Sequence, residues 1–75
     1  MDTPDLDALR LTYKQAVDAW VTAIRAEEAL ATPDHSETAW ERWDDAGNLA
    51  EAAEDKAIQA RDAYKDGLRR VNFGF

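Results

Sequence analysis

The chain has 75 residues, a net charge of −7, no cysteine and a single histidine, His35. This composition excludes disulfides, thiolate metal sites and the usual multi-histidine zinc site, and an acidic chain lacks the basic surface that binds nucleic acid directly. Because so short a chain buries little apolar surface by itself, we expect it to associate with another chain, and we expect no cofactor.

A membrane span needs roughly 18 consecutive apolar residues, and the sequence has no such run. Residues 1–5 are acidic, whereas a signal peptide begins with basic residues. These features predict a soluble, cytoplasmic protein.

The first helix is predicted over residues 4–31. Thr3 is the expected N-cap, with Pro4 at the first helical position and Asp5 and Asp7 at the positive end of the helix dipole. Apolar residues then recur at helical spacing on one broad face, namely Leu6, Leu9, Tyr13, Ala16, Val17, Trp20, Ala23, Ile24, Leu30 and Ala31.

A second helix is predicted over residues 34–71, beginning at a cap on either Thr32 or Asp34. Its apolar seam alternates steps of four and three residues without a miss, which is typical of a helix that packs along others as in a coiled coil. Most seam positions are alanine or glycine, so a partner helix can approach closely. The seam consists of Ala39, Trp43, Ala46, Ala50, Ala53, Ala57, Ala60, Tyr64, Gly67 and Val71.

Gly47 and Asn48 leave two interpretations of this second helix open. Glycine before asparagine, with Glu51 three residues further on, is the pattern of a helix end followed by a newly capped helix. The seam nevertheless crosses Gly47 without a change of phase, which favours one continuous helix, bent at most.

The short connection around Pro33 predicts an antiparallel hairpin. If the turn centres there, the numbers of facing residues sum to about 67, which places Trp20 opposite Gly47 and Tyr13 near Glu54. The second helix then outruns the first beyond residue 63, and the aromatic tail 72–75 follows it.

Several apolar residues lie off the seam, such as Ile58, or in the predicted overhang, and a hairpin alone cannot cover them. The simplest cover is a second copy, which gives a homodimeric four-helix bundle. An antiparallel arrangement is favoured because residues 34–55 carry eight acids and one base, whereas residues 56–75 carry two acids and five bases. The predicted self-association residues are Trp40, Leu49, Tyr64, Leu68, Val71, Phe73 and Phe75.

The same acidic segment supports an alternative function. An inhibitor or antidote could use residues 34–55 to occupy a basic, nucleic-acid-binding site on another protein, although acidic helix faces are usually only solvated. The candidate contact residues are Glu37, Glu41, Asp44, Asp45, Glu51 and Asp55.

Catalysis is not predicted. Glu27 and His35 could form an acid–base pair near the turn, but no nucleophile, oxyanion donor or phosphate-binding loop accompanies them, and Glu27 could simply accept a hydrogen bond from an indole or an arginine. We therefore expect a non-enzymatic interaction or scaffold module, with the acidic inhibitor as the alternative and a subunit of a larger helical enzyme as a third class.

Overall fold

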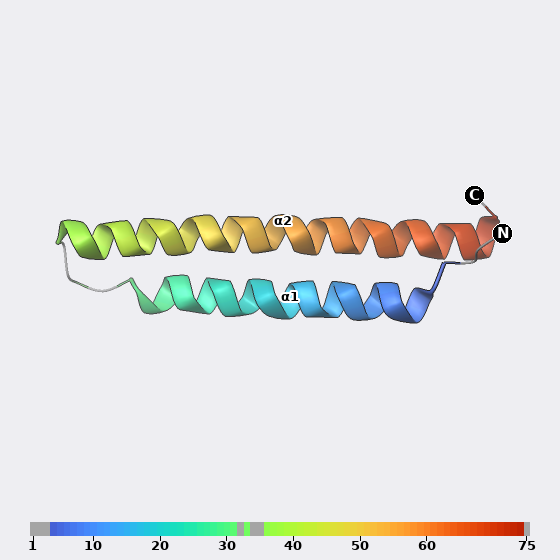
Figure 1. Ribbon diagram of the computed structural model, residues 1–75, viewed down its shortest axis with the longest axis horizontal. Coiled ribbons are helices and arrows are strands. Elements are labelled where there is room, and N and C mark those ends of the chain that lie inside the picture. The colour runs from blue at the N-terminus through green and yellow to red at the C-terminus, as the bar shows by residue number, and fades with distance from the viewer. Residues whose placement is uncertain (1–3, 32, 34–35, 75) are drawn as a thin grey trace.

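The computed structural model describes residues 4–31, 33 and 36–74. Two helices, α1 over Leu6–Ala29 and α2 over Glu37–Phe73, lie side by side and run in opposite directions (Figure 1). This confirms the all-helical hairpin predicted from the sequence. The molecule is a rod of 57 × 15 × 14 Å with a radius of gyration of 17.2 Å. A compact chain of this length would have a radius of gyration of about 11 Å.

The helices begin at caps other than the predicted ones. Asp5 caps α1 by accepting a 3.1 Å hydrogen bond from the Ala8 N–H, so Pro4 precedes the helix and Thr3, outside the described residues, is not its cap. Ser36 caps α2 by accepting a 3.2 Å hydrogen bond from the Ala39 N–H. The predicted caps Thr32 and Asp34 also lie outside the described residues, and each precedes the observed start.

The second helix is continuous through Gly47 and Asn48, so the uninterrupted interpretation is the observed one (Figure 1). It ends two residues later than predicted, at Phe73. Gly74 follows with a φ of 75°, and its N–H donates a 2.9 Å hydrogen bond to the Arg70 carbonyl. Glycine adopts this left-handed conformation without strain, so it closes the helix.

The register of the two helices differs from the predicted one. A Cβ built on Gly67 would lie 2.7 Å from Leu9 Cδ1, and one built on Gly47 would lie 2.8 Å from Glu27 Oε2. Facing residue numbers therefore sum to about 75, and the predicted pairs of Trp20 with Gly47 and of Tyr13 with Glu54 are wrong. The prediction assumed helix ends level at the turn, whereas α2 begins beyond the end of α1 (Figure 1).

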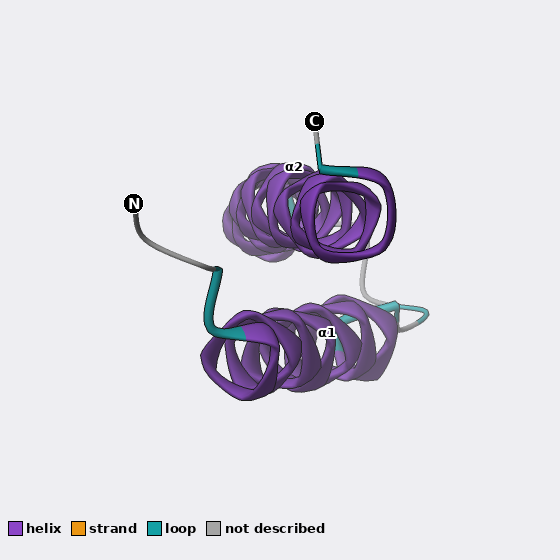
Figure 2. Ribbon diagram, turned by 90° about the vertical axis from the view of Figure 1, so that its right-hand side faces the viewer, coloured by secondary structure: helices purple, strands orange, loops and turns teal. Residues whose placement is uncertain are grey.

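The core of the hairpin is thin. The seam of α2 does face α1, since eight of its ten positions are buried or half-buried and only Trp43 and Val71 are exposed. Among the described residues, however, only Ala50, Ala57 and Gly67 are fully buried, and α1 contains no buried residue. Viewed end on, the rod is a single pair of helices (Figure 2). Each helix therefore keeps a large part of its surface open.

Candidate interaction surface

A groove of about 610 Å³ opens between the helices at the turn end of the rod. Its wall on α1 consists of Trp20, Ile24 and Glu27, and its wall on α2 includes Trp40, Trp43, Asp44, Gly47, Glu51 and Glu54. Three tryptophans in one concave surface are notable because aromatic residues of this size commonly anchor protein interfaces. The groove is therefore the first candidate for an interaction site.

The rim of this groove is built from the overhanging start of α2. Since Ala29 ends α1 opposite about residue 46, roughly two turns of α2 extend beyond it. Trp40 and Trp43 lie in these turns and stack edge to face, with ring centroids 5.4 Å apart and an angle of 88° between the planes. Trp40 is still 65% exposed and Trp43 38% exposed. The two indoles therefore pack against each other, but no other part of the hairpin that the structure describes buries them.

Glu27 brings a carboxylate into this apolar setting. It is half-buried, and its Oε2 lies over Gly47, where the missing side chain leaves room for it. The sequence suggested that Glu27 could accept a hydrogen bond from an indole or an arginine. Among the described residues it accepts neither. His35, the suggested acid–base partner, lies outside the described residues. The groove thus contains four carboxylates, those of Glu27, Asp44, Glu51 and Glu54, without an assembled catalytic set around them among the described residues.

The opposite end of the rod is better covered than the sequence predicted. Tyr64 is half-buried and packs on Tyr13, with ring centroids 6.5 Å apart. Leu9 and Leu6 lie over Gly67, and Leu68 is half-buried. The expectation that the α2 residues beyond 63 lack partners within the chain is therefore wrong for Tyr64. The reason is the register, which moves the overhang to the turn end.

The other predicted self-association residues are exposed to different degrees. Leu49 and Phe73 are each 69% exposed and Val71 is 43% exposed, whereas Phe75 lies outside the described residues. Leu11 and Val21 of α1 are also exposed, at 53% and 39%, and were not predicted because they fall outside the main apolar face of that helix. Their only sequence signal is a large aliphatic residue at a position that should be polar.

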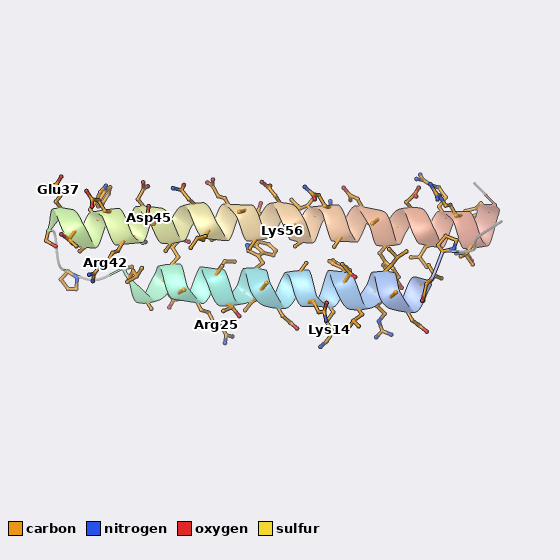
Figure 3. All side chains as sticks on the ribbon, in the orientation of Figure 1. Lys14, Arg25, Glu37, Arg42, Asp45 and Lys56 are labelled. Carbon is orange, nitrogen blue, oxygen red and sulfur yellow. The ribbon has the colours of Figure 1, made fainter. Side chains whose placement is uncertain are left out.

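All six residues of the predicted acidic surface are exposed, as expected for charges on a solvated helix face. Glu37 points away from α1 (Figure 3). None of the six forms an ion pair within the part of the chain that the structure describes. Lys14 and Arg25 point outward from the far side of α1 and so do not neutralise this surface (Figure 3).

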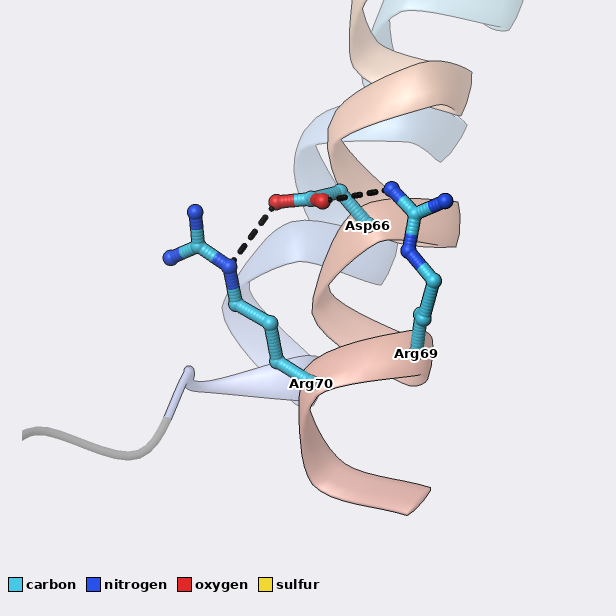
Figure 4. A network of polar contacts seen from close by, with 3 residues as sticks. All are labelled: Asp66, Arg69 and Arg70. Carbon is cyan, nitrogen blue, oxygen red and sulfur yellow. Dashed lines mark hydrogen bonds and ion pairs between the residues drawn. The ribbon is translucent and has the colours of Figure 1, made fainter. Parts of the chain in front are cut away.

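Positive charge gathers instead near the end of α2. Asp66 accepts a 2.8 Å hydrogen bond from Arg69 Nη2 and lies 3.1 Å from Arg70 Nε (Figure 4). The hydrogen bond from Arg69, together with the charges of both arginines, holds the pKa of Asp66 below its ordinary value despite some opposing desolvation. The two ends of α2 thus differ strongly in charge.

No three His, Cys, Asp or Glu side chains among the described residues come close enough together to hold a metal ion. Neither α1 nor α2, as described, has an apolar stretch long enough for a membrane-spanning helix.

Comparison with protein-family models, curated proteins and solved structures finds no match to this chain. The function is therefore inferred from the surface, charge and packing of the hairpin itself.

Proposed function

We propose that this protein is a small cytoplasmic interaction or scaffold module that works as a homodimer, in which two hairpins form a four-helix bundle. The observation that supports it best is the exposed area. The chain exposes 6071 Å², whereas a compact monomer of 8.4 kDa exposes about 4,600 Å². The difference, about 1,500 Å² per chain, exceeds the roughly 800 Å² that each partner buries in an ordinary stable interface.

The composition of the exposed surface supports the same proposal. The groove lined by Trp20, Trp40 and Trp43, which we call the tryptophan groove, lies open along the rod, as do the exposed apolar residues of both helices. Among the described residues, only two alanines and a glycine are fully buried. Burying such residues is what drives association of amphipathic helices. A second hairpin supplies a matching apolar surface without any further partner.

Light scattering coupled to size-exclusion chromatography tests the proposal. At micromolar concentration the expected mass is twice the 8.4 kDa of the chain. A stable mass of 8.4 kDa would rule out the homodimer.

The exposed acidic residues support one alternative, an inhibitor that occupies a basic site on another protein. Its six carboxylates form no ion pairs among the described residues, so they are available to an external cation. Ionic strength separates the two functions, because binding through exposed charges weakens steeply between about 50 mM and 1 M salt. A dimer held by apolar burial keeps its mass across that range.

A further inference from the structure

Beside the seam, α2 carries a second row of residues that again alternates steps of four and three. The row is Trp40, Asp44, Gly47, Glu51, Glu54, Ile58, Arg61, Lys65 and Leu68. Its first five members all line the tryptophan groove. Because residues at this spacing follow one stripe along a helix, the remaining four continue the same flank of α2 toward its other end. We call these nine residues the flank row.

Charge divides the flank row into two halves. The half before Ile58 contains Asp44, Glu51 and Glu54, whereas the half after it contains Arg61 and Lys65. Glu51 and Glu54 form no ion pair among the described residues, and neither does Lys65. Arg61 forms an ion pair with its neighbour Asp62, at 3.3 Å, with its side chain still 44% exposed. The charges of the flank row are therefore largely uncompensated by the residues that the structure describes.

We propose that a second copy of this chain docks on the flank row, with the two α2 helices antiparallel and a two-fold axis passing at Ile58. This rests on the homodimer proposed above and specifies its interface. In a two-fold interface, if one residue contacts a second, the second contacts the first on the other copy. Centring the axis at Ile58 pairs Glu54 with Arg61 and Glu51 with Lys65 of the partner copy, and each pair then occurs twice.

The uncharged members of the flank row fit this pairing as well. Ile58, 38% exposed, meets its own counterpart at the axis. Gly47 and the Leu68 of the partner copy fall opposite each other along the row, with the Glu27 carboxylate of the first copy lying over Gly47. A parallel pairing would instead set Glu51 and Glu54 against their own copies and repel. Opposed charges across helix interfaces select orientation in this way, even where they add little affinity.

The same arrangement explains the position of the groove. Its apolar wall on α1, formed by Trp20 and Ile24, adjoins the flank row, so the C-terminal part of the partner's α2 lies over the groove, once on each side of the axis. Leu49 lies on the other flank of α2, because Leu49 and Glu51 are on opposite sides of the buried Ala50. It is therefore outside this interface.

Thiol cross-linking tests the axis directly, because the natural chain contains no cysteine. A short bifunctional thiol reagent is expected to link I58C to itself. Neither E51C nor K65C should link to itself, since each pair of copies would lie on the order of 20 Å apart along the helices. A mixture of E51C and K65C should link. All three positions are exposed, so the substitutions leave the hairpin intact, which circular dichroism verifies.

The outcomes separate this inference from the homodimer itself. Self-linking of E51C or K65C, or a dimer in which I58C fails to link, overturns the axis while the homodimer stands. A monomer by light scattering overturns both.

Charge reversal gives a second test. E51K/E54R alone and R61E/K65E alone should each weaken the dimer at least tenfold, because every pair becomes repulsive, and the four substitutions combined should restore it to within about threefold. The matched control E41K/D45R changes net charge as much as E51K/E54R but lies outside the flank row, so it should leave the dimer intact. Failure of the fourfold variant to recover would overturn the pairing.

Discussion

At the scale of single residues, Gly47 and Gly67 are two glycines of α2 over which side-chain atoms of α1 lie. They should respond differently to alanine. Replacing a glycine inside a helix stabilises it by ~0.5–1 kcal/mol. At Gly47 the atom in the way is the end of the Glu27 side chain, which can turn into the open groove. At Gly67 the new Cβ meets Leu9 at 2.7 Å and Leu6 at 3.3 Å, and these leucines are packed between the helices.

We therefore predict that Gly47→Ala raises the midpoint of thermal unfolding and that Gly67→Ala lowers it. Circular dichroism at equal protein concentration measures both, and each variant serves as the control for the other. Equal stabilisation by the two substitutions would mean that Leu9 does not pack over Gly67 as described.

Asp66 provides a prediction about pH. Its pKa lies below the ordinary value of 3.8, first because Arg69 donates a hydrogen bond to it. A lowered pKa in the native state stabilises the fold above the pKa of the unfolded chain, and this contribution is lost as pH falls through the native pKa. Replacing Arg69 by alanine should move the pKa of Asp66 back up, as carboxyl NMR titration would record. Arg42→Ala, at the other end of α2, should leave it unchanged.

Residue types alone were enough to predict that a residue of α1 packs closely against a glycine of α2. They were not enough to predict which residue of α1 does so. The sequence shows Gly67 on the seam, Gly47 beside it and many large residues on the first helix, so close approach at a glycine was expected. Which large residue meets Gly47 depends on the register, and Glu27 rather than Trp20 occupies that place. The opposite charges at the two ends of α2, by contrast, were evident from the sequence, because the order of charges along a single helix does not depend on the register.

At the scale of the helices, the central observation is the register. The seam of α2 and the apolar face of α1 were both predictable, because their spacing follows directly from helix geometry. The offset between them was not, since an alanine seam with a three-four repeat packs acceptably at several offsets that differ by a heptad. The register differs by about that much from the predicted one, and the overhang consequently lies at the turn end.

The register predicts specific contacts that NMR can detect. Nuclear Overhauser effects are expected between the rings of Tyr13 and Tyr64, whose centroids are 6.5 Å apart. Protons of Leu9 should likewise show effects to the α-protons of Gly67. Contacts of Tyr13 with Glu54, or of the Trp20 indole with Gly47, would instead support the hairpin with level ends and contradict the register described here.

At the scale of the whole molecule, the hairpin exposes far more surface than its mass requires, and its tryptophan groove and flank row are open on one face. The sequence predicted association from chain length and from the absence of cysteine. The groove could not be predicted, because it depends on which flank of α2 faces Trp20 and Ile24, and that follows from the register.

The concentration dependence of thermal unfolding tests most directly whether a second copy completes the core. If folding is coupled to dimer formation, the unfolding midpoint must rise steadily as the protein is concentrated from about 1 to 100 µM, because association stabilises only the folded chain. A midpoint that stays constant over this range, with a mass of 8.4 kDa throughout, would show that one hairpin is stable alone and would contradict the account.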